Sequence, residues 1–173
     1  ANGADNESEV QKIQMLFNQA KITTATRKVT TVAKKRREET GTPCAAIELA
    51  DGTMITSKSS ELLGPSAALL LNATKYLAGI DHNAKLIPQE MIEPIQKTKV
   101  EYLGGNNPRL HTDEVLVALS VLSQADDNCR KALEQLPALR GCQVPSTVML
   151  SEVDHKIFKK LGVGLTCDPV KKK

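Results

Sequence analysis

Aromatic residues are almost missing from this sequence of 173 residues, which has two tyrosines, two phenylalanines and no tryptophan. Proteins that bind single-stranded nucleic acids stack bases on aromatic side chains, so this scarcity argues against such a surface. No apolar run reaches the roughly 18–20 residues that span a bilayer, and no signal peptide opens the chain. We therefore expect a cytoplasmic protein without a membrane partner. The net charge of +3 is too small an excess to indicate a nucleic-acid-binding protein.

The cysteines form neither a metal-binding nor a disulfide pattern. Cys44, Cys129, Cys142 and Cys167 include no C-x-x-C pair, which structural zinc sites usually contain, so we expect no metal and no other cofactor. A chain of this length buries enough surface to fold without disulfides. Its 40% of hydrophobic and 25% of charged residues are ordinary for a soluble globular domain. The thiols are expected to be reduced and buried.

The first forty residues differ in character from the rest. The sequence predicts a helical, basic N-terminal segment over 1–40, an α/β domain over 41–170 and a disordered basic tail over 171–173. Within the first segment, Arg27–Arg37 holds six basic residues and no acidic one. This run fits an anion- or nucleic-acid-binding patch, or a solvated helix face balanced by the two glutamates that follow it.

The order of the remaining elements predicts a single α/β domain, with a small mixed sheet flanked by helices. A β-hairpin is indicated by two alternating stretches around Asp51-Gly52, the dipeptide of a two-residue type I′ turn: 44–49 and 53–57. Proline and glycine punctuation predicts a buried helix over 64–78. Further helices are expected over 89–103, 112–123 and 126–136. The C-terminal part predicts a strand, a helix and a parallel strand over 147–150, 153–161 and 163–167.

This element order is roughly that of the cytidine-deaminase-like sandwich. Those enzymes hold zinc through H-x-E or C-x-E on one helix and P-C-x-x-C on the next. The corresponding helices here begin Pro65-Ser66-Ala67 and Ser151-Glu152-Val153-Asp154, so both ligand sets are absent. The order therefore predicts a likeness of fold without the zinc ligands.

The segment 104–114 is the strongest candidate for a ligand site. A Gly-Gly-Asn-Asn-Pro turn leads into a predicted helix N-terminus, whose unpaired N–H groups and positive potential suit a phosphate or carboxylate. Arg109 can add a bidentate contact, and His111 can exchange a proton near neutral pH. The candidate ligand-binding residues are Asn107, Arg109, His111, Thr112 and Asp113.

A purely structural interpretation of the same segment remains open. In it, Thr112 caps the helix, and Asp113 and Glu114 interact favourably with the helix dipole. Arg109 then pairs with a carboxylate. The two acidic side chains would also repel an anion.

Six stretches of the sequence carry a family resemblance: AAIEL-x-DG at 45–52, LLG-x-SAALLLNA at 62–73, IEPIQK at 92–97, NPRLHTDEVL at 107–116, EQLP-x-LRGC at 134–142 and LSEVD at 150–154. In this order they resemble the C-terminal part of bacterial proteins in the domain-of-unknown-function family 1846. The resemblance covers about 39–169. It implies a longer parent protein whose N-terminal α/β region contains a phosphate-loop-like segment. No G-x-x-x-x-G-K-[ST] motif occurs here, and the family has no established reaction, so no catalytic residue is carried over.

Two functional hypotheses follow. The first is an accessory binding or assembly domain, whose apolar helices 64–78 and 112–123 pack on the N-terminal region of the parent or on a second copy. In the second, Arg109, His111 and Asp113 contribute a phosphate- or carboxylate-binding part of an active site completed by the N-terminal region. Its ligand would be a phosphorylated small molecule. Whether the parent is an enzyme stays open.

Overall fold

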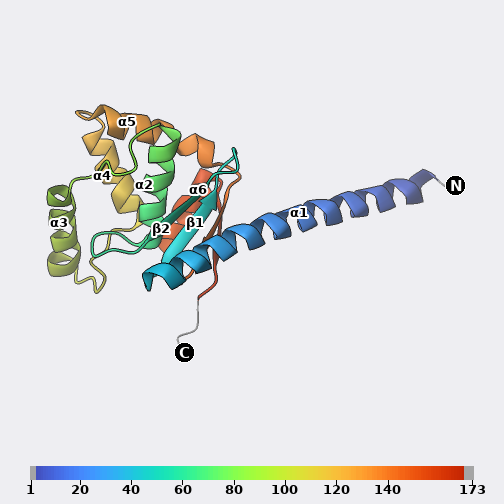
Figure 1. Cartoon of the computed structure of the whole chain (residues 1–173), viewed down its shortest axis with the longest axis horizontal. Coiled ribbons are helices and arrows are strands. Elements are labelled where there is room, and N and C mark those ends of the chain that lie inside the picture. Colours follow the sequence, from blue (N-terminus) through green and yellow to red (C-terminus); the bar gives the residue numbers. More distant parts are fainter. Residues whose placement is uncertain (1–2, 170–173) are drawn as a thin grey trace.

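A four-stranded sheet lies between the long N-terminal helix on one face and the remaining helices on the other (Figure 1). This computed structural model describes residues 3–169, without the side chains of 3–7 and 20–27. The tail predicted over 171–173 lies outside the described residues. The elements in chain order are α1 (Gly3–Thr40), β1 (Cys44–Glu48), β2 (Met54–Lys58), α2 (Pro65–Leu77), α3 (Gln89–Lys97), the π-helix η1 (Thr98–Tyr102), α4 (Thr112–Leu122), α5 (Asp127–Glu134), the 3-10 helix η2 (Leu136–Leu139), β3 (Gln143–Ser146), α6 (Glu152–Leu161) and β4 (Gly164–Cys167).

The sheet confirms the predicted α/β class with its hairpin and its β-α-β unit. Its strand order is β2-β1-β3-β4. β1 and β2 pair antiparallel, and β3 and β4 pair parallel across α6. β1 and β3 are antiparallel, which makes the sheet mixed.

Alternate residues of β1 face opposite layers, and both layers are covered. Ala46 packs on Val29 and Ala33 of α1. Ala45 and Ile47 belong to the larger core that α2 and α6 close from the other side. A second core fills the space between α2, α4 and α5. The predicted burial of α2 against the sheet is therefore confirmed.

The hairpin connection differs from the expected two-residue type I′ turn. Leu49 N–H donates to the Thr53 carbonyl oxygen at 2.9 Å, and Gly52 N–H donates to the Leu49 carbonyl oxygen at 2.9 Å. Residues 50–52 therefore form a three-residue loop between the hydrogen-bonded pair Leu49 and Thr53. A type I′ turn needs positive φ at both central residues, whereas Gly52 (φ +83°) has it here and Asp51 does not.

The strand expected over 147–150 is wrong, because the third strand is the preceding tetrapeptide 143–146. The Ser146 hydroxyl donates to the Val148 carbonyl oxygen at 2.8 Å, which turns the chain out of the sheet. Pro145 lies within β3 although it cannot donate a ladder hydrogen bond. The apolar run at 147–150 therefore predicted the strand four residues too late in the chain.

No helix in residues 3–169 combines the length and the apolar character needed to cross a bilayer. Three of the four cysteines are buried and Cys167 is partly exposed, and all four are free thiols.

Candidate functional site

A cavity of about 400 Å³ opens where the N-termini of α2, α4 and α6 converge. Each helix contributes the residues at its start: Gly64 and Ser66 for α2, His111 for α4 and Ser151 for α6. The rest of the wall is formed by Pro43, Ser59, Pro65, Asn107, Arg109, Val148, Met149, Leu150 and Asp154. Helix N-termini carry partial positive charge, and of these three only α2 has neither a side-chain cap nor an acidic residue in its first turn. The start of α2 is therefore the one that favours an anionic ligand.

Main-chain hydrogen bonds hold the starts of α2 and α4 beside each other. Leu110 N–H donates to the Leu62 carbonyl oxygen at 2.9 Å, and Gly64 N–H donates to the Leu110 carbonyl oxygen at 3.2 Å. Leu110 itself is fully buried. The segment that carries Arg109 and His111 is thus anchored on both sides by the backbone, which gives the cavity a defined wall.

Arg109 is oriented by its neighbours but keeps its charged end free. Its main-chain N–H donates to Asn107 Oδ1 at 3.1 Å, and its Nε donates to the Ser60 carbonyl oxygen at 2.5 Å. Within residues 3–169 the two terminal guanidinium nitrogens have no hydrogen-bond partner. The expected pairing of Arg109 with a carboxylate is therefore wrong, and these nitrogens remain available to a ligand.

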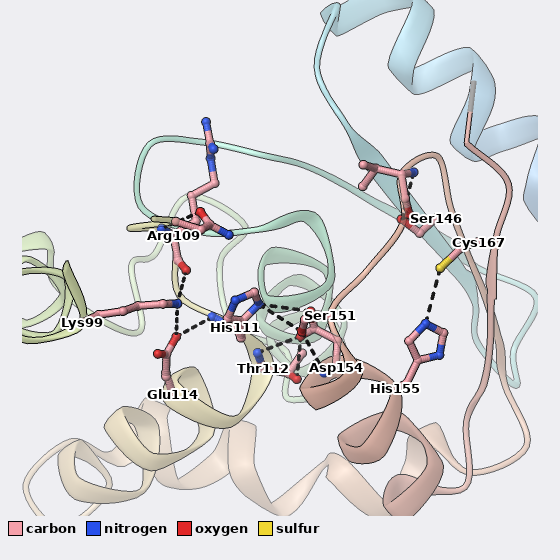
Figure 2. Close-up of polar contacts among 12 residues, drawn as sticks. Lys99, Arg109, His111, Thr112, Glu114, Ser146, Ser151, Asp154, His155 and Cys167 are labelled. Atoms are coloured by element: carbon pink, nitrogen blue, oxygen red, sulfur yellow. Dashed lines mark hydrogen bonds and ion pairs between the residues drawn. The ribbon is translucent and has the colours of Figure 1, made fainter. Parts of the chain in front are cut away.

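Asp154 is the centre of the polar network behind this wall (Figure 2). Its side chain is 2% exposed. Its Oδ1 accepts from Thr112 N–H at 3.0 Å and from the Thr112 hydroxyl at 2.8 Å. Its Oδ2 accepts from the Ser151 hydroxyl at 2.8 Å and lies 3.2 Å from His111 Nδ1. These contacts join the N-termini of α4 and α6 through one carboxylate.

The network keeps Asp154 ionised. Burial alone raises the pKa of Asp154, but hydrogen bonds from Thr112 and Ser151, with the adjacent His111, bring it below its ordinary value. A carboxylate only accepts hydrogen bonds, so His111 Nδ1 carries the proton in this contact. His111 Nε2 has no hydrogen-bond partner within the described residues.

Ser151, His111 and Asp154 do not form a catalytic triad. In a triad the carboxylate and the serine lie at different nitrogens of the imidazole. Here the Ser151 hydroxyl lies 3.3 Å from Nδ1, the nitrogen that faces Asp154, and it donates its proton to Asp154. It also accepts from Asp154 N–H at 3.2 Å as the N-cap of α6. Ser151 therefore positions a helix and is not activated as a nucleophile.

Glu114 is neutralised by a neighbouring lysine. Its Oε2 accepts from His111 N–H at 2.7 Å and from Lys99 Nζ at 2.9 Å. Lys99 Nζ also donates to the Arg109 carbonyl oxygen at 2.7 Å. The repulsion of an anion expected from Glu114 is thus offset by the charge of Lys99.

The five candidate residues take different places. Asn107, Arg109 and His111 line the cavity. Thr112 is fully buried against Asp154, and the N-cap of α4 is His111, so the expected capping role of Thr112 is wrong. Asp113 does not line the cavity, and its Oδ1 is buried without a hydrogen-bond partner in the described part of the chain.

Among the wall residues that the sequence analysis did not select are Ser66, Ser151 and Asp154. The pattern Ser151-x-x-Asp154 resembles a helix-capping motif, which predicts where α6 begins. It contains no signal for contact with His111, about forty residues earlier in the chain. Ser66 is almost fully buried at the start of α2.

The basic run of α1 is largely paired within the domain. Lys28 bonds to Glu48, Lys34 to Asp168 and Arg36 to Glu39. Arg37 donates to the Thr147 carbonyl oxygen at 3.3 Å. The side chain of Arg27 lies outside the described residues. These contacts favour the helix-face interpretation of the run, and nucleic-acid binding stays untested.

No cluster of three histidine, cysteine or acidic side chains suited to a metal occurs within the described residues. Cys167 Sγ and His155 Nε2 lie 3.7 Å apart on a different side of α6 from the cavity network (Figure 2).

Comparison with known proteins gives the family. The profile of the family described as "Domain of unknown function DUF1846, C-terminal" matches residues 25–173. The chain belongs to the DUF1846 family. The expected resemblance is confirmed.

Several bacterial UPF0371 proteins are similar to this DUF1846 domain. One from Corynebacterium aurimucosum is 50% identical over 169 residues, covering 98% of this chain and 34% of the relative. One from Corynebacterium efficiens is 52% identical over 158 residues, covering 91% and 32%. One from Streptococcus sanguinis is 46% identical over 165 residues, covering 95% and 33%. The chain thus spans about a third of the length of these relatives.

Proposed function

We propose that this DUF1846 domain supplies the anion-binding part of a site that is completed by another region of a longer protein. The ligand would be a small molecule with a phosphate or carboxylate group. The observation that carries the proposal is the cavity, which Arg109 and His111 line together with the N-terminus of α2.

The charges around the cavity support an anion despite the nearby acids. Asp154 is the one acidic side chain in the wall, and its oxygens accept from Thr112, Ser151 and His111. Arg109 is left without an ionic partner within the described residues. A volume of about 400 Å³ is within the range of small-molecule pockets.

The accessory assembly role keeps separate support from α4. Val117 and Val121 are exposed on this helix, whereas most of α2 is buried. Of the two predicted contact helices, α4 therefore retains an uncovered apolar surface. Its partner would be the N-terminal region of the parent or a second copy. The cytidine-deaminase likeness and the cytoplasmic location stay predictions.

Titration with inorganic phosphate tests the anion site. Arg109→Ala is expected to weaken phosphate binding at least tenfold, because it removes the free charged donors of the cavity. Arg130→Ala is the matched control, since Arg130 is exposed on α5 and pairs with Asp127 and Glu134. Binding is followed by thermal shift, where a ligand at 100 times its dissociation constant adds about 2.7 kcal/mol of stability.

The titration is made on this chain and on the full-length protein. Phosphate binding that Arg109→Ala leaves unchanged in both would refute the proposal, as would no binding to either. Equal weakening by the Arg130→Ala control would show that only overall charge matters.

A further inference from the structure

The N-terminal half of α1 carries an uncovered apolar surface. Val10, Ile13, Leu16 and Phe17, here called the α1 stripe, recur at helical spacing and are between 53% and 63% exposed. The stripe includes one of only two phenylalanines in the chain. Apolar residues grouped in this way mark interaction sites, whereas single exposed ones need no explanation.

The α1 stripe faces away from the side of α1 that packs on the sheet. At 100° per residue, Ile13 and Val29 point about 160° apart around a continuous helix, as do Phe17 and Ala33. Val29 and Ala33 are the buried residues that contact the sheet. A segment that continued the sheet along the same side of α1 would therefore leave the stripe uncovered.

The shape of the molecule agrees with a separate partner. α1 is 38 residues long, about 57 Å, and its N-terminal half projects beyond the α/β body (Figure 1). Most helical stability in proteins comes from packing an apolar face, whereas the stripe side chains are exposed in the described part of the chain. The stripe thus lacks the contact that such a helix needs.

The family comparison indicates which partner covers the stripe. The C-terminal family profile begins at residue 25, after the stripe, whereas the relative from C. aurimucosum aligns over 98% of the chain. About two-thirds of that relative lies outside the aligned part. α1 therefore extends beyond the C-terminal unit into sequence that the relatives share.

We infer that the α1 stripe is a docking surface for the region that precedes this domain in the longer protein. A second copy of the chain fits less well, because four side chains offer roughly half of the ~800 Å² per partner that a stable complex buries. A covalently linked region needs less area, since the link gives it a high effective concentration. This surface is remote from the cavity, so the inference stands apart from the anion site.

Amide hydrogen exchange on the full-length protein and on this 173-residue chain tests the inference. The amides of residues 8–19 are expected to exchange at least tenfold more slowly in the full-length protein. Leu16→Glu with Phe17→Glu should abolish that protection. Tyr102→Glu with Leu103→Glu is the matched control, an equally exposed aromatic and leucine pair at the end of η1, and should leave protection intact.

Equal exchange of residues 8–19 in the two proteins would overturn the inference. So would a dimer of the 173-residue chain, seen by sedimentation, that the Leu16/Phe17 variant dissociates and the control does not. That second result would assign the stripe to another copy. A monomeric chain together with slowed exchange in the full-length protein supports the inference.

Discussion

The cavity and the α1 stripe are two contrasting regions of one chain. Around the cavity, hydrogen bonds to Asp154 join the starts of α4 and α6, and main-chain hydrogen bonds of Leu110 join the starts of α2 and α4. Along the stripe, four apolar side chains lie on one helix and touch no other element of the described domain closely enough to be covered. The first region is organised by the domain itself, whereas the second is the surface that we propose as a docking site.

This difference separates two sources of stability. Residues around α2, α4 and α6 should contribute to the free energy of unfolding of the isolated domain. Residues of the α1 stripe should contribute only when the partner region is present, because burial is what stabilises an apolar side chain. Substitutions in the two regions test whether their contributions to the free energy of unfolding differ in this way.

The largest effect is expected in the core beside the cavity. Leu119 is 1% exposed between α2, α4 and α5, so Leu119→Ala should lower the free energy of unfolding by about 3 kcal/mol. Val117→Ala, on the exposed side of the same helix, is the control and should change it by less than about 0.5 kcal/mol. Urea unfolding measures both, and equal effects would contradict the assigned core.

A smaller loss is expected from Asp154→Asn. The substitution removes a charged acceptor that serves Thr112 and Ser151, at a cost of about 2 kcal/mol. Glu152→Gln changes an exposed acid two residues earlier on α6 and should change stability by less than about 0.5 kcal/mol. A loss below that of the control would show that the network does not join the helices.

The same variant has a defined pH signature. The pKa of Asp154 is lowered in the folded protein, so its contribution is complete above the unfolded value of about 3.9 and is lost as pH falls through the folded value. The difference in stability between wild type and Asp154→Asn should therefore shrink as the pH is lowered from neutral through the acidic range below about 4. Urea unfolding across this range tests it, and a constant difference would refute the role of the charge.

The smallest effect is expected on the α1 stripe. Leu16→Ala in the isolated domain should change the free energy of unfolding by less than about 0.5 kcal/mol, although the same substitution at Leu119 is severe. The two variants are compared in one urea titration. A loss above 1 kcal/mol at Leu16 would mean that the stripe is already buried in the isolated domain.

Much of the local structure could be predicted from the sequence. The hairpin strands and the punctuation of α2 by Pro65 and Gly79 are confirmed. The helix expected over 126–136 forms as α5, which Asp126 caps. These features depend on residues within a few positions of one another. The predicted type I′ turn was wrong because Asp51 does not take the positive φ that such a turn needs. The predicted position of the third strand was wrong because the strand includes Pro145, a residue that disfavours strands.

Part of the candidate site was also within reach of the sequence. Asn107, Arg109 and His111 lie in one short segment, so their nearness needed no knowledge of the fold. The local sequence suffices to predict that this segment is a turn leading into a helix, because glycine, asparagine and proline restrict the backbone locally. The sequence likewise predicts the long, charged helix that the structure shows over Gly3–Thr40.

Which residues surround that segment depends on tertiary packing and could not be predicted from the local sequence. Asp154 contacts His111, and Ser66 lines the same cavity, because packing brings the starts of α6, α2 and α4 to one place. Packing also decided that Val29 and Ala33 are buried while Ile13 and Phe17 are not. All four are apolar residues in a helix. Whether each is buried depends on whether another element of the fold packs against it, and the local sequence does not specify this.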